Sequence, residues 1–130
     1  MLDCSSVYFG NKYEGWARFL NYMLIHNPEL EKLLVAYIRD NRGKDEYLSL
    51  RLMRVYKVGE LLEYYARSLP KTSDNLHVLT NVRLQFWRRV MEALLRDVPL
   101  KKEVVDQYIA TRDTLRSFEE KERQREFAIA

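Results

Sequence analysis

The spacing of apolar residues is the feature that most constrains the fold of this chain. From residue 11 onward, apolar side chains recur every three or four positions, and no segment alternates apolar with polar residues over the length of a strand. A period close to 3.6 residues places such side chains on one face of an α-helix. The 4 glycines and 3 prolines also leave few of the special turns that sandwiches and barrels need. We therefore predict an all-α protein, a bundle of four or five helices.

The length of the chain, 130 residues, suits a single domain. We expect an N-terminal apolar arm over residues 1–10, a helical bundle over residues 11–118 and a C-terminal extension over residues 119–130. The extension is highly charged as far as residue 126 and apolar after it. It is either a solvated helix end or a hook that docks onto another subunit.

Local signals set the expected helix boundaries. They comprise N-cap residues, a proline at a first helical position, a glycine suited to a left-handed stop, and a proline that ends a helix. In chain order these residues are Asn11 with Glu14, Asn27 with Pro28, Gly43, Asp45 and Pro70. Two further helices are expected, one from about Leu76 to Asp97 and one that starts near Pro99.

The third predicted helix carries a seam of apolar and small residues at alternating spacings of four and three. The seam residues are Leu48, Leu52, Val55, Gly59, Leu62, Ala66 and Leu69. Such a seam over three heptads predicts close, nearly parallel or antiparallel packing of this helix on another helix. Gly59 would let the neighbouring backbone approach closely.

The motifs of common catalytic and cofactor sites are absent from the sequence. There is no dinucleotide fingerprint, no phosphate loop, no His-Glu-x-x-His and no Cys-x-x-Cys. Cys4, His26 and His77 come from distant segments, so we expect no metal site. Glu60 and Glu63 are the best local candidates for acid–base chemistry, but a solvated strip beside the seam explains them better. We therefore expect no enzyme, no cofactor and no small-molecule substrate.

Basic residues are better organised than any catalytic group. The chain has 22 basic and 19 acidic side chains, and arginines outnumber lysines 14 to 8. Arginine is suited to bidentate contacts with phosphate, and no sequence-reading module is visible, so we predict contacts to a nucleic-acid backbone. The candidate residues are Arg42, Lys44, Arg51, Arg54, Lys57, Arg83, Arg88, Arg89, Arg96, Lys101 and Lys102. The alternative interpretation of these bases is a solvated surface.

Aromatic residues crowd the N-terminal part of the chain. They leave more apolar surface than one small bundle easily covers, and large uncovered patches mark contacts with proteins or lipids. We therefore predict association with like or different subunits. The candidate interface residues are Tyr8, Phe9, Tyr13, Trp16, Phe19, Tyr22, Phe127 and Ile129.

Several of these features occur together in one known group of proteins. They are the aromatic segment 8–25, the basic residues Arg51, Arg54 and Lys57, the Arg88–Arg89 pair and the apolar end 127–130. In outline the chain resembles the helical-bundle major coat proteins of filamentous archaeal viruses. The resemblance implies a capsid protein of the virion that wraps double-stranded DNA as pairs of subunits and holds it in A form. The many Arg, Glu and Tyr residues are also typical of proteins from hot environments.

Two functional hypotheses follow from the sequence. The first is a structural, self-associating protein that binds the nucleic-acid backbone without sequence specificity, in a virion or in the cytoplasm. The alternative is a small helical adaptor or regulatory subunit that binds a protein partner. The N-terminal residues have no basic start and no long apolar run, so we expect no secretory signal. No run of 18 apolar residues occurs, so we expect no transmembrane segment.

Overall fold

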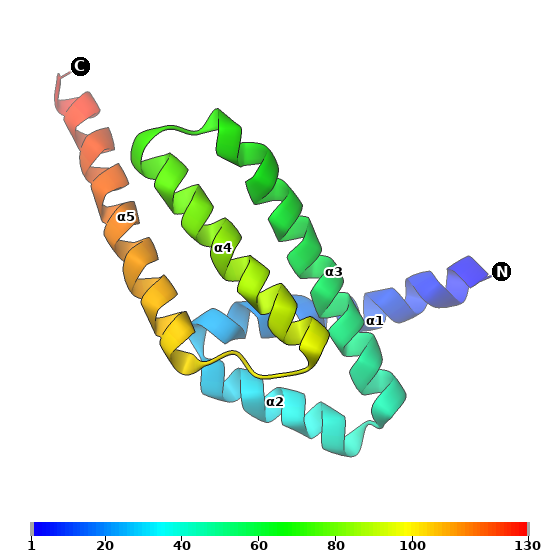
Figure 1. Ribbon diagram of the computed structural model, residues 1–130. Coiled ribbons are helices and arrows are strands. Elements are labelled where there is room, and N and C mark those ends of the chain that lie inside the picture. The colour runs from blue at the N-terminus through cyan, green and yellow to red at the C-terminus, as the bar shows by residue number, and fades with distance from the viewer. Residues whose placement is uncertain (1, 130) are drawn as a thin grey trace. The chain divides into compact units, whose positions relative to one another are not determined.

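The computed structural model describes the backbone of residues 2–129 and the side chains of residues 13–117 (Figure 1). Within these residues every regular element is a helix and none is a strand, which confirms the prediction of an all-α protein. The elements are α1 (Leu2–His26), α2 (Pro28–Asn41), α3 (Lys44–Ser68), a 3-10 turn η1 (Leu69–Lys71), α4 (Asp74–Arg96) and α5 (Lys102–Ile129).

The boundaries on either side of α2 follow the predicted signals. Asn27 is the N-cap, and its side-chain oxygen accepts a hydrogen bond from the backbone N–H of Leu30 at 3.2 Å. Pro28 occupies the first helical position. Gly43 has a φ of 89°, a left-handed conformation that costs glycine little and other residues more. Local chemistry therefore separates α1, α2 and α3 as expected.

Three predicted helix starts are wrong. The helix α1 begins at Leu2, so residues 2–10 belong to this helix and Asn11 does not cap it. No proline interrupts this segment, and a glycine inside a helix costs only about 1 kcal/mol. The helix α3 begins at Lys44, which places Asp45 in its first turn. The helix α5 begins at Lys102 and not near Pro99.

The chain divides into two compact units. Unit 1 comprises Met1–Glu60 and Met91–Pro99, and unit 2 comprises Leu61–Val90 and Leu100–Ala130. The backbone passes from one unit to the other three times, inside α3, inside α4 and between Pro99 and Leu100. The single domain expected from the chain length stays a prediction.

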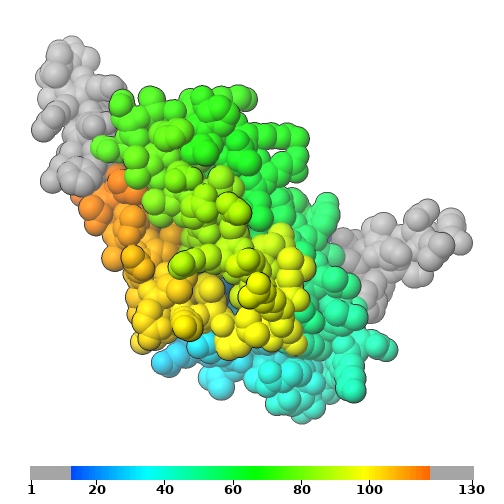
Figure 2. Space-filling model, viewed as in Figure 1, coloured from blue at the N-terminus to red at the C-terminus, as the bar shows by residue number. Residues whose placement is uncertain are grey.

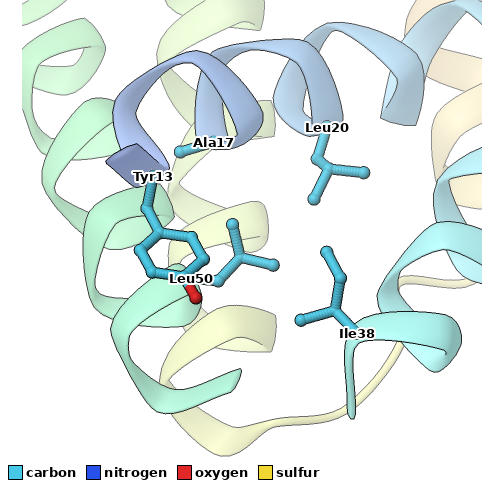
Figure 3. Close-up of a cluster of buried hydrophobic side chains, with 5 residues drawn as sticks. All are labelled: Tyr13, Ala17, Leu20, Ile38 and Leu50. Carbon is cyan, nitrogen blue, oxygen red and sulfur yellow. The ribbon is translucent and has the colours of Figure 1, made fainter. Parts of the chain in front are cut away.

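Unit 1 has a core built from three helices (Figure 3). Tyr13, Ala17 and Leu20 on α1 gather around Ile38 on α2 and Leu50 on α3. The three α1 residues are three or four positions apart, so they share one face of the helix. Burial of large apolar side chains stabilises the unit by about 1.5–3 kcal/mol for each.

Unit 2 has an aromatic core on α4 and α5. The rings of Phe86 and Tyr108 stack with their centroids 3.9 Å apart, and Trp87 meets Phe86 edge to face at 5.2 Å. Leu79, Phe86 and Val90 on α4 are buried. On α5 the buried positions are Val105 and Tyr108.

The predicted seam on α3 is wrong, because none of its seven residues is buried and Ala66 is exposed. Leu48 and Leu52 are exposed, whereas Leu50, Arg54 and Val58 are buried. The same helix therefore packs through a face that carries an arginine at its centre. Gly59 also has a smaller role than predicted, because a Cβ added there would meet only the Cε of Met91, at an ordinary distance of 3.8 Å.

Candidate functional site

Arg54 lies in the core of unit 1. The residue is 5% exposed, and its Nε donates a hydrogen bond to Asn21 Oδ1 at 2.8 Å. A terminal guanidinium nitrogen lies 3.8 Å from Glu31 Oε2. Asn21 on α1 and Glu31 on α2 are themselves buried, so one polar network joins three helices. This burial contradicts the placement of Arg54 on a phosphate-binding surface, because the cation is enclosed and paired.

Burial also shifts the protonation of this network. It raises the pKa of Glu31 above its ordinary value of 4.5, and the attraction of Arg54 only partly offsets the effect. It lowers the pKa of Arg54, against the attraction of Glu31. Both shifts have the same cause, the loss of water around a charge. Burying this charged pair therefore costs desolvation free energy, as it commonly does for buried ion pairs, and the packing around the pair holds it in place.

The raised pKa of Glu31 predicts the pH dependence of stability. A carboxyl group whose pKa is higher in the folded state binds a proton more tightly when folded. Its contribution to stability is fully present below about pH 4.5, the ordinary value, and is lost as the pH rises through the folded pKa. Wild type should therefore gain stability relative to Glu31→Gln as the pH falls from 7 towards 4.5. Urea unfolding across this range measures the difference, and a difference that does not change with pH would contradict it.

Glu14 does not confound that measurement, because its shift has the opposite sign. A hydrogen bond from Lys57 and the charge of Lys57 lower the pKa of Glu14. The contribution of Glu14 is therefore present above its ordinary value of 4.5 and is lost only as the pH falls below it.

Arg51 caps the C-terminal end of α4. Its Nε and a terminal nitrogen donate hydrogen bonds to the backbone oxygen of Leu94 at 3.2 and 2.7 Å, and the same terminal nitrogen donates to that of Leu95 at 3.3 Å. Asp97 follows the helix with a φ of 55°, accepts a hydrogen bond from the Tyr47 hydroxyl and lies 3.5 Å from the guanidinium. The last carbonyls of a helix need such donors. A capping role therefore replaces the predicted phosphate contact of Arg51.

Removal of this cap should destabilise the protein without changing nucleic-acid binding. Arg51→Ala takes away three charge-assisted hydrogen bonds, so we expect a loss of about 1–2 kcal/mol in the free energy of unfolding. Arg51→Lys keeps a cation and should lose less. Chemical unfolding gives the stability, and fluorescence anisotropy with duplex DNA gives the affinity. A fall in affinity at unchanged stability would instead assign Arg51 to the binding surface.

Lys57 is engaged by two carboxylates. Its Nζ lies 2.7 Å from Glu14 Oε1 and 3.4 Å from Glu60 Oε1. The hydrogen bond to Glu14 is the largest cause that raises the pKa of Lys57. The three basic residues predicted for the third helix, Arg51, Arg54 and Lys57, thus all bind other parts of unit 1.

The other predicted bases divide between a half-buried arginine and an exposed set. Arg83 is half-buried and lies near Tyr108. Burial raises the pKa of Tyr108, and the charge of Arg83 offsets only part of that increase. The exposed bases are Arg42, Lys44 and Arg96 in unit 1 and Arg88, Arg89, Lys101 and Lys102 in unit 2. In the described part of the chain none of these seven forms an ion pair with an acidic side chain. In Figure 2, α2 (cyan) and the end of α4 (yellow) lie open on the visible face.

Large apolar side chains are exposed on α1 and α2. Trp16, Phe19 and Tyr22 are exposed, as an interface requires, whereas Tyr13 belongs to the core and is wrong as an interface residue. Tyr8, Phe9, Phe127 and Ile129 lie outside the described side chains. Leu33 and Tyr37 on α2 are exposed as well, and the sequence predictions did not place them in an interface. The signal that could have found them is the apolar stripe of α2, which is broad for a short helix.

We define the α1–α2 face by its five exposed residues, Trp16, Phe19, Tyr22, Leu33 and Tyr37. A shallow hollow of about 110 Å³ opens on it, with Trp16 of α1 and Tyr37 of α2 among its lining residues. Leu34 and Ile38 also line the hollow, and Arg42 and Glu46 contribute its polar groups. The face is thus apolar with a recess for a small apolar group.

Both histidines contact neighbouring groups of the chain. The His26 ring stacks on Tyr22 at 3.9 Å, and His77 Nδ1 lies 3.0 Å from the backbone oxygen of Leu69. No group of three potential metal ligands occurs among the described residues. No described helix is long and apolar enough to cross a membrane.

The chain was compared with protein families, curated proteins and solved structures. No family model, no curated protein and no solved structure matches it. Function is therefore inferred from the side chains alone.

Proposed function

We propose that this chain is a structural, self-associating helical protein that binds the nucleic-acid backbone without sequence specificity, in a DNA-coating role such as that of a virion protein. The observation that supports binding most directly is the set of four exposed bases in unit 2, Arg88, Arg89, Lys101 and Lys102. No acidic side chain in the described residues neutralises them in an ion pair. Cations without ionic partners can bind phosphates without first breaking a salt bridge.

The position of Lys101 and Lys102 adds to this argument. They lie at the N-terminal end of α5, where the helix dipole is positive. A cation at this end costs about 0.3–1 kcal/mol, and a bound anion would offset that cost. Arg88 and Arg89 lie within α4, away from its ends, and their planar guanidinium groups are suited to phosphate oxygens. Contacts of this kind position a protein on a duplex but do not read its bases.

A variant of the α4 pair tests the proposal. Each phosphate contact contributes about −0.9 to the slope of log K against log salt, so Arg88→Ala with Arg89→Ala should flatten the slope by about 2. Arg88→Ala alone should flatten it by about 1. The measurement is anisotropy of a fluorescent DNA duplex at several salt concentrations. Because both side chains are exposed, the fold should not change.

Arg67→Ala is the matched control. Arg67 is also exposed on unit 2, but Glu63 already binds its guanidinium, so the slope should stay at the wild-type value. An unchanged slope in the Arg88 and Arg89 variants would show that this pair does not contact the DNA.

A helical adaptor that binds a different protein is the second candidate function. The exposed apolar residues of the α1–α2 face favour it, because such a face suits a protein partner. The two functions separate by their response to salt. Backbone binding weakens steeply as salt rises, whereas apolar contacts with a protein do not. Absence of DNA binding at low salt, together with a salt-insensitive protein complex, would support the adaptor.

A further inference from the structure

We propose that the α1–α2 face is covered by a second copy of this chain in a two-fold symmetric dimer. In this dimer Leu33 of each copy enters the hollow of the other. The proposal rests on the self-association in the proposed function and assigns it to a face, a partner and a contact. It is independent of whether the chain binds nucleic acid.

The face is open to solvent. Its five large side chains are 42–68% exposed, and Leu33 is the most exposed of them. The rings of Trp16 and Phe19 meet edge to face with centroids 6.3 Å apart. Trp16 and Tyr37 line the same hollow, which joins the two helices into one surface. A small folded unit that leaves so many aromatic groups in water gains free energy when a partner covers them.

The apolar area of the face matches what a stable dimer needs. Taking about 200 Å² for a large side chain, the five residues together expose about 500 Å². A standard interface buries about 800 Å² on each partner, and homodimer interfaces are about 65% apolar, which corresponds to about 520 Å² of apolar surface. Two copies of this face therefore supply the apolar centre of an ordinary homodimer.

The face is also complementary to itself. A two-fold interface uses the same patch on both partners, so it must carry both a projecting group and a recess for it. Leu33 projects from α2, and Tyr37, one turn later on the same side of the helix, lines the recess. When two copies of α2 pack antiparallel, Leu33 of one copy meets Tyr37 of the other, and the reverse contact follows by symmetry.

Charge favours a second copy over a strongly charged partner. The charged residues on α1 and α2 near the face are Glu14, Arg18, Glu29, Lys32, Arg39 and Asp40, and Arg42 and Glu46 line its hollow. Four of these residues are acidic and four are basic, so the face has no net charge with which two copies would repel each other. A nucleic acid or an acidic peptide would find no excess of opposite charge at this face.

The test is sedimentation equilibrium of the full chain without nucleic acid. Wild type should be a dimer at micromolar concentrations, at low and at high salt alike. Leu33→Asp places a charge in each recess and should raise the dissociation constant at least about 100-fold. Leu52→Asp is the matched control, because Leu52 is 59% exposed on α3 outside the face. That variant should dimerise like wild type, and circular dichroism should show all three proteins to be equally helical.

Three results would overturn the proposal. They are a monomeric wild type at all concentrations, a Leu33→Asp variant that dimerises like wild type, and dissociation caused by Leu52→Asp but not by Leu33→Asp. Duplex binding is measured separately. A dimer that does not bind DNA would contradict the proposed nucleic-acid binding but not this inference. A monomer that binds DNA would contradict this inference but not the proposed nucleic-acid binding.

Discussion

Arg54→Ala is expected to lose about 3–5 kcal/mol in the free energy of unfolding. The substitution removes the partner of a buried carboxylate, Glu31, and it takes from Asn21 Oδ1 the hydrogen bond that Arg54 Nε donates. A buried charge without its partner costs more than the pair itself contributes. Urea unfolding followed by circular dichroism measures the loss. A change below about 1 kcal/mol would contradict the buried network of unit 1.

A double variant separates the effect of charge from the effect of volume. Arg54→Met with Glu31→Leu removes both charges and keeps apolar groups of similar size. Replacement of a buried ion pair by packed apolar residues is often neutral or stabilising, so this variant should recover most of the loss. A double variant as unstable as Arg54→Ala would show that shape, not charge, determines the contribution of Arg54.

Phe86→Ala is expected to have a similarly large effect in unit 2. Phe86 is 4% exposed, and its ring stacks on Tyr108 and makes an edge-to-face contact with Trp87. Its truncation removes apolar burial and leaves a cavity, which together cost about 3–5 kcal/mol. Urea unfolding gives the free energy, and the near-ultraviolet circular dichroism of Trp87 should weaken at the same time. A loss below about 1 kcal/mol would show that the aromatic core is not packed as described.

These two variants together test the predicted single domain. Arg54 lies in unit 1 and Phe86 in unit 2, but α3 and α4 each run through both units. If the chain is one cooperative domain, each variant shifts one unfolding transition of the whole helical signal. Two separate transitions, with each variant moving only one of them, would show two domains.

The sequence predicted elements whose cause is local. The recurrence of apolar residues every three or four positions is enough to identify helices, and a side chain such as Asn27 needs only its own next residues to cap one. Gly43 likewise adopts its left-handed conformation because glycine has no Cβ, which is a property of the residue itself. These parts of the fold were therefore predictable.

The orientation of α3 was not predictable in this way. Leu48 and Leu52 match a helical repeat as well as Leu50 does, so the pattern fits two faces. The structure buries the face with Arg54, because Asn21 and Glu31 from two other helices supply its partners. Those partners are 33 and 23 residues away in the chain, and no local pattern connects them.

The same reason explains the errors in the candidate site. Whether a base is free depends on acids and carbonyls that the fold brings to it, such as Glu14 for Lys57 and Leu94 for Arg51. Arg88 and Arg89 were predictable as exposed because the polar face of their own helix is continuous. Exposure of Leu33 and Tyr37 depends on how much of α2 the other helices cover, which the apolar pattern does not tell.

The central claim is that this chain binds a nucleic-acid backbone through exposed bases. The most direct test is the affinity of the wild-type protein for two unrelated fluorescent duplexes, measured by anisotropy from about 50 mM to about 200 mM salt. With the four exposed bases of unit 2 in contact with phosphates, the slope of log K against log salt should be about −4 and the same for both duplexes. Absence of binding to either duplex at about 50 mM salt would contradict the claim.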